Sequence, residues 1–148
     1  MDNFDELWTE VTKWGEGQAE LISTAGRRLT APEISVARKV GVKEPESIRI
    51  LIVESVPFPT PPGIRIVALE QGFDPDQMGG MTLGRGIFIR RDQEMRAEIW
   101  RHEFRHVAQY ECFGSIGSFM FFYLKELLHF RYGSGPLEID AAAAENAP

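Results

Sequence analysis

The chain of 148 residues is long enough for one domain, and its 43% hydrophobic and 26% charged residues are typical of a globular protein rather than a disordered or fibrous one. A formal net charge of −6 at pH 7, without a stripe of Lys and Arg to neutralise phosphates, argues against nucleic acid as a partner. Cys112 is the only cysteine, which excludes an internal disulfide and a multi-thiolate zinc site. Any metal must therefore be bound by histidines and carboxylates.

The N-terminal segment MDNFDELWTEVTKW is acidic and amphipathic and lacks the basic and apolar regions of a secretory signal, so we expect a cytoplasmic protein. The longest apolar stretch, 116–128, is interrupted by Ser118, Lys125 and Glu126. It is also shorter than the roughly 18 to 20 apolar residues that span a bilayer. It predicts a buried core helix and no stable membrane insertion.

Two helices are predicted in the N-terminal part. Apolar residues spaced near the helical period predict a helix over 4–29, which Gly15 and Gly17 weaken or break. Thr30 then stands before a proline and a glutamate, which combines a capping hydroxyl with a favourable first turn. A second short helix is therefore expected to run to about Val40.

Three runs rich in β-branched residues predict strands over 47–56, 64–69 and 86–90. A proline cluster at 57–62 ends the first run, and a segment rich in Gly, Pro and Asp, 71–80, connects the second to the third. Together these runs predict a small antiparallel or mixed sheet.

The C-terminal part is predicted to be helical. A helical pattern covers 92–111, Gly114 interrupts it, and a very apolar helix follows over 115–132. Pro136 is placed to open a last, Ala-rich helix over 137–147. The pattern contains no repeat and no linker of the kind that separates domains.

The segment HEFRH contains the residues that predict metal binding and catalysis. On a helix, His102 and His106 lie on one face, so their imidazoles can bind one ion. Glu103 is offset by roughly 100° around the helix, where its carboxylate reaches a water on the metal without competing as a ligand. Zinc would lower the pKa of that water to about 7, Glu103 would accept its proton, and the hydroxide would attack a polarised carbonyl. The motif predicts metal-assisted amide hydrolysis.

The same letters occur by chance in roughly one chain in several hundred of this length. The context favours the metal, because the motif falls within a predicted helix that follows a predicted strand. That helix has an apolar arc formed by Ile99, Trp100, Phe104, Val107 and Ala108.

A catalytic zinc usually has three protein ligands and one open position. Glu138, an acid without an obvious solvated role at the start of the last helix, is the predicted third ligand, with Asp140 as the next choice. The alternative is that Glu138 binds no metal and only interacts favourably with the dipole of the last helix. His129 within the apolar helix is more typical of a core or boundary histidine, and Cys112 is a weaker candidate still.

The stretch HEFRHVAQYECFGSIGSFMFFYLKELL, followed by PLEIDA, resembles the HExxH zincins, specifically small gluzincin-like metallopeptidases grouped as a domain of unknown function. The likeness covers about residues 81–142. It implies Zn²⁺ on His102 and His106, Glu103 as the catalytic acid and base, and the acidic third ligand of the family at Glu138.

The resemblance also implies that Thr82-Leu83-Gly84, leading to Ile87-Phe88-Ile89, forms a strand before the motif helix whose edge pairs with an extended substrate. Better-characterised gluzincins have an Asp four residues after the ligand Glu, where it orients a zinc-bound His; this chain has Ala142 there. Gln109 or Asp140 could orient an imidazole instead, as metal-bound histidines normally require.

The expected fold is α+β, a zincin-like single domain over 1–148. It would comprise an N-terminal helical segment, 1–45, and a core with the zinc site, 47–142. The expected function is a zinc-dependent peptidase acting on a peptide or protein, and the oligomeric state is left open.

Three other functions are alternatives to the peptidase. One is a catalytically inactive zinc-binding domain with a structural or protein-interaction role. A deformylase-like hydrolase would need a cysteine before the motif, whereas Cys112 follows it. The aromatic stretch 119–124 could be an exposed docking face, although such a helix is more often core. The residues that could stabilise an oxyanion by their chemistry are Tyr110, Tyr123, Tyr132 and Arg105, and each also fits a structural role.

Overall fold

A four-stranded sheet lies at the centre of the computed structural model, which describes residues 3–148. Its strands are β1 (Arg27–Arg28), β2 (Arg49–Val53), β3 (Gly80–Leu83) and β4 (Gly86–Arg90), in the order β1-β2-β4-β3. The central pair β2 and β4 is parallel, while β1 and β3 are antiparallel to their neighbours. The sheet is therefore mixed, and β3 forms one of its edges.

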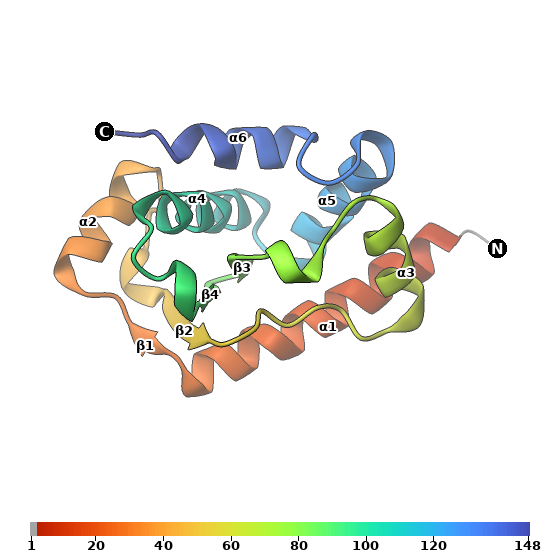
Figure 1. The fold of residues 1–148 in the computed structure, drawn as a ribbon, viewed down its shortest axis with the longest axis horizontal. Coiled ribbons are helices and arrows are strands. Elements are labelled where there is room, and N and C mark those ends of the chain that lie inside the picture. Colours follow the sequence, from red (N-terminus) through yellow and green to blue (C-terminus); the bar gives the residue numbers. More distant parts are fainter. Residues whose placement is uncertain (1–2) are drawn as a thin grey trace.

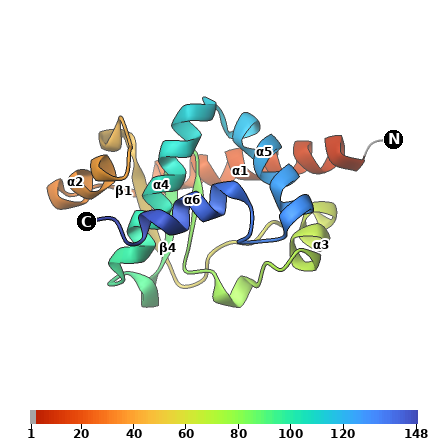
Figure 2. The same ribbon diagram turned by 90° about the horizontal axis from the view of Figure 1, so that it is seen from above.

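The helices of the described residues lie on both faces of this sheet. They are α1 (Asn3–Ala25), α2 (Ala31–Lys39), α3 (Pro62–Glu70), α4 (Ala97–Phe113), α5 (Ile116–Phe130) and α6 (Pro136–Ala144). Figure 1 shows α1 below the sheet, α4 above it and α6 above α4. Seen from above in Figure 2, α6 crosses over α4. The α+β class expected from the sequence is confirmed.

The central strand β4 is buried on both faces. Ile87 and Ile89 have no exposed surface and pack in a cluster with Phe104 of α4. Phe88 points to the opposite face because side chains alternate along a strand, and it packs in a second cluster with Ile22 of α1. Two hydrophobic clusters thus fix α1 and α4 to opposite sides of the sheet.

The strand predicted over 64–69 is wrong, since these residues belong to α3. Pro62 occupies the start of the helix, where its missing N–H is not needed. Ile64 and Ala68, four residues apart, are the buried pair, and Ile66 between them is exposed. The period of burial is therefore helical, and tertiary packing overrides the β-propensity of the isoleucines and valine.

The long helix α1 continues without a break through Gly15 and Gly17. A Cβ atom at Gly15 would lie 3.3 Å from both Leu83 and Met120, so this glycine allows close approach of the strand and α5. The expected break is wrong, because packing against the sheet and α5 outweighs the low helix propensity of glycine.

The predicted bounds of α2 and α5 are confirmed closely, whereas the helix expected from residue 92 begins at Ala97 and the strand expected over 47–56 is limited to Arg49–Val53. The hydroxyl of Thr30 accepts the N–H of Glu33, whose carboxylate accepts the N–H of Thr30, and this capping box opens α2. The apolar helix α5 buries Phe119, Met120, Leu124 and Leu127 but leaves Phe122 47% exposed. Among the described residues, none of the helices has the length and apolarity needed to cross a bilayer.

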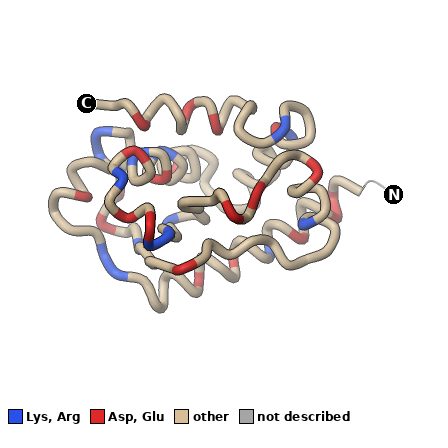
Figure 3. Tube along the Cα trace, in the orientation of Figure 1, with Lys and Arg blue, Asp and Glu red and all other residues tan. Residues whose placement is uncertain are grey.

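Acidic and basic residues are interspersed along the trace in Figure 3. Glu111 near the end of α4 is a partly buried example, with 9% of its side chain exposed. Its carboxylate accepts the N–H groups of Lys43 and Glu44 at 2.8 and 3.0 Å and the guanidinium of Arg85 at 3.0 Å. Burial opposes its ionisation, but these donors together hold the pKa of Glu111 below its ordinary value. This carboxylate joins α4 to the α2–β2 connection and the β3–β4 turn.

We expect Glu111→Gln to lower the free energy of unfolding at neutral pH by about 1 to 3 kcal/mol, because charge-assisted hydrogen bonds are lost. A carboxyl with a depressed folded-state pKa stabilises the fold above its ordinary pKa of 4.5. That contribution is lost as the pH falls through the folded-state value, so the difference between variant and wild type should shrink in acid. Urea denaturation at several pH values, with the exposed Glu20→Gln as control, measures it. A difference independent of pH would contradict this account.

Candidate metal centre

The residues of the HEFRH motif lie in the middle of α4, as the sequence predicts. α6 then brings Glu138 over them, and its position depends on a cap supplied by α5. Glu126 accepts the N–H of Leu137 at 2.7 Å, which satisfies a free donor in the first turn of α6. A Cβ atom at Gly135 would lie 2.8 Å from the same Glu126 oxygen, so the glycine makes room for the cap.

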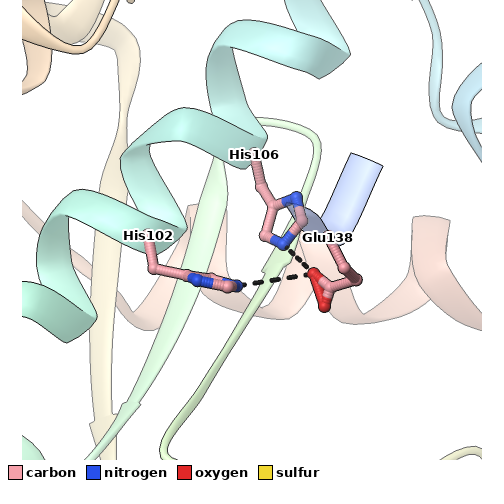
Figure 4. Close-up of side chains that lie close together, drawn as sticks. All are labelled: His102, His106 and Glu138. Carbon is pink, nitrogen blue, oxygen red and sulfur yellow. Dashed lines mark ion pairs between the residues drawn. The ribbon is translucent and has the colours of Figure 1, made fainter. Parts of the chain in front are cut away.

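Three side chains converge on one point between α4 and α6 (Figure 4). Oε1 of Glu138 lies 2.5 Å from Nε2 of His106 and 3.4 Å from Nε2 of His102. The three ligand atoms lie within 4.8 Å of one another, which makes the group a candidate for holding a metal ion. The structure thus brings together the three residues predicted as ligands.

The chemistry of this group fits Zn²⁺. Two imidazoles and a glutamate are the donor set of many catalytic zinc sites. Oε1 of Glu138 is buried and has no partner in hydrogen-bonding geometry despite its closeness to both rings. Because buried polar atoms are normally satisfied, this oxygen is the observation that favours a bound ion.

Each imidazole is oriented through its other nitrogen. Nδ1 of His106 lies 2.8 Å from Oε1 of Gln109, an oxygen that can only accept, so Nδ1 carries the proton and Nε2 is free for an ion. Nδ1 of His102 lies 2.8 Å from a carboxylate oxygen of Glu145, with the same consequence. Of the two expected partners, Gln109 contacts an imidazole directly, whereas Asp140 accepts a hydrogen bond from Gln109.

Glu145 was not predicted from the sequence. It follows the end of α6 and stands seven residues, about two helical turns, after Glu138. This spacing returns it to the face of α6 that carries Glu138, and the sequence offers that signal. Glu145 thus contacts His102, whereas Ala142 has no side-chain group that could orient it.

The cluster carries opposite charges at close range. Burial opposes protonation of His102, but the nearby carboxylate of Glu138 and the negative charge of Glu103 outweigh burial and raise the pKa of His102 to about 9. Burial also opposes ionisation of Glu138, but the two histidines hold its pKa well below the usual range. A metal ion binds neutral imidazoles, so its binding here would compete with protonation of these rings.

Glu103 lies beside the cluster and outside the ligand group. It is buried, and one of its carboxylate oxygens, Oε1, accepts the hydroxyl of Thr82 on β3 at 2.8 Å. A Cβ atom at Gly80 would lie 3.0 Å from Cγ of Glu103, so β3 both fixes this carboxylate and leaves room for it. Glu103 also lines the cavity beside the cluster, where a water or substrate would lie. Sequence spacing gave no sign of the Thr82 contact.

The structure reduces the number of candidates for the oxyanion-stabilising residue and for the third metal ligand. Arg105 forms an ion pair with Asp140 at 2.7 Å, and the hydroxyl of Tyr110 donates to the carbonyl of Thr82 at 3.2 Å. These two side chains therefore have structural roles, and His129 and Cys112 are not members of the ligand group. Three tyrosines, Tyr110, Tyr123 and Tyr132, line the same cavity as the cluster, and the hydroxyl of Tyr110 is the one already bonded to Thr82.

The cavity beside the cluster has a volume of about 110 Å³. Side chains from α1, α3, β3 and α5 form its walls, and His102, Glu103, His106 and Glu138 form one side. The predicted metal site therefore faces a space that a small group can enter.

A scan against protein-family models gives no match, and searches of curated proteins and of solved structures give none either. The residues of this site and their geometry are therefore the basis on which a function is proposed.

We expect Glu145→Ala to weaken zinc binding by about ten- to hundredfold, as removal of a partner that orients a metal-bound histidine typically does. His102 would keep its place on α4 but lose the acceptor that fixes its tautomer. Competition with a fluorescent zinc chelator measures the affinity, and the neighbouring exposed Asn146→Ala is the control. Equal affinities for both variants would show that Glu145 does not orient the ligand.

Proposed function

We propose that this protein is a zinc-dependent metallohydrolase that cleaves peptide bonds. One observation carries the proposal: His102, His106 and Glu138 converge with a buried, unsatisfied carboxylate oxygen at their centre. Support comes from Glu103, which stands next to this group, outside it, and faces the same cavity. Together with the mixed sheet and the edge strand β3, this arrangement is our basis for a zincin-like interpretation of the fold.

The proposed mechanism assigns a separate task to each residue. A bound Zn²⁺ would supply the acidity that activates water and would polarise the carbonyl of the substrate. Glu103 holds one oxygen on Thr82 and uses the other to accept a proton from the attacking water. As the C–N bond breaks, the same carboxyl group returns this proton to the leaving nitrogen. One water is consumed, and a carboxylic acid and an amine are formed.

The proposed substrate is an extended peptide. β3 is an edge strand of the sheet, and an edge strand can pair with an added strand. The carbonyl of Thr82 already accepts the hydroxyl of Tyr110, so the remaining backbone groups of β3 would form this pairing. Gly80 to Leu83 also line the cavity, and Thr82 among them holds Glu103. A peptide paired with β3 would therefore lie next to the general base.

The second candidate function is a catalytically inactive zinc-binding module with a structural or protein-interaction role. The observation that favours it is the engagement of Arg105 and Tyr110 in structural contacts, which removes two of the four candidates for stabilising an oxyanion. Tyr123 and Tyr132 remain on the cavity wall and favour the hydrolase.

We expect the wild type and Glu103→Gln to contain close to one zinc per chain, and Glu138→Ala to lose most of it, because only Glu138 is a ligand. Elemental analysis of the three proteins, purified without added metal, measures the content. Wild-type protein that is purified without zinc and does not bind added zinc would contradict the proposal.

The same proteins test catalysis in a mixture of unstructured peptides analysed by mass spectrometry. The wild type should cleave and a chelator should stop it, and Glu103→Gln should be slower by about two to four orders of magnitude, as for loss of a general base. Zinc bound in full without any cleavage would favour the inactive module.

A further inference from the structure

The cavity beside the cluster is apolar except on the side of the cluster. Its walls include Val11 of α1, Ala68 of α3, and Leu124 and Leu127 of α5, all of them buried. No Lys, Arg or Asp of the described residues lines it, and its two carboxylates belong to Glu103 and Glu138. A charged group entering the apolar part would lose its hydration without gaining a partner.

The size of the cavity limits what can enter it. Its volume of about 110 Å³ compares with a well-studied engineered cavity of about 150 Å³, lined by Leu, Ile and Phe, that stays dry and binds benzene. A branched aliphatic or a single-ring aromatic side chain is therefore of suitable size. A methyl group would leave most of the space empty, so the side chains that line the cavity would lack contacts with it.

The position of the cavity connects it to a peptide. Side chains of an extended strand alternate between its two faces, so a peptide paired with β3 directs every second side chain to one side. Because Gly80, Met81, Thr82 and Leu83 all line the cavity, one side chain of such a strand can enter it while the backbone lies beside Glu103.

We propose that this cavity binds one bulky, uncharged side chain of leucine to phenylalanine size from a peptide, next to the bond that is cut, and that Ala68 sets its depth. The statement about cleavage rests on the proposed function, whereas the binding of the side chain does not. The proposal gives α1 and α3, which carry none of the cluster residues, a part in selecting the substrate.

The test measures binding in the absence of turnover. The full chain is kept in a chelator and titrated with N-acetyl-leucinamide, N-acetyl-phenylalaninamide and N-acetyl-alaninamide, followed by NMR chemical shifts. Each methylene moved from water into an apolar site favours binding by roughly fourfold. We therefore expect the leucine and phenylalanine compounds to bind at least about tenfold more tightly than the alanine compound.

Two variants change the volume of the cavity in opposite directions, and a third variant serves as the control. Ala68→Val should reduce the preference for leucine over alanine to less than about threefold, because added methyl groups occupy the space. Leu127→Ala should shift the preference from leucine to phenylalanine, because it enlarges the cavity. Ile66→Phe, on the exposed side of α3, should leave all three affinities unchanged. Circular dichroism confirms that each variant is folded.

The results separate this proposal from the proposed function. Preferential binding that Ala68→Val removes supports the cavity even if no peptide is ever cleaved. Equal binding of the three compounds, or a preference that both cavity variants leave unchanged, overturns it even if the protein proves to be an active hydrolase. If peptides are cleaved, cut sites without a bulky apolar residue at a constant position also overturn it.

Discussion

The amide of Gln109 is the contact on which the candidate site depends, because it joins the two helices that carry the ligands. Its oxygen accepts from His106 on α4, while its NH₂ group donates to the carbonyl of Leu137 and the carboxylate of Asp140 on α6. The side chain is buried, so each of these bonds is stronger than it would be in water and costly to lose. One amide therefore fixes a histidine tautomer and the docking of α6 at the same time.

The buried charges of the site are difficult to explain by stability alone. Glu103 and Glu138 are both buried, and one oxygen of Glu138 has no aligned partner. Apolar residues of similar volume would be at least as stable in such a position. Caps and hydrogen bonds from α5 and β3, through Glu126 and Thr82, nevertheless hold these carboxylates in place. Such an arrangement is more typical of a binding or catalytic site than of a packing contact.

The sequence predicts what depends on local spacing and misses what depends on distant packing. The helical position of His102 and His106 follows from their spacing, and Glu138 was chosen as an acid without another role. The contact of Thr82 with Glu103 joins a strand to a helix 21 residues away, so no local pattern could show it. The segment 64–69 differs from its predicted strand for the same reason: its isoleucines favour a strand, and only the burial of Ile64 and Ala68 in the folded protein shows the helical period.

The parallel pairing of β2 with β4 places α3 within the connection between them, in the order β2, α3, β3, β4. The ladder keeps its register through the pairs from Arg49 with Gly86 to Val53 with Arg90, and none of the three ligand residues lies in the intervening segment. Connections at a surface tolerate changes of length and sequence better than the elements they join. Variation in α3, the helix of this crossover that lines the cavity without contacting Glu103, can thus reshape one wall of the cavity while β3 and the ion-binding residues stay the same. Substrate preference and reactivity can then diversify separately.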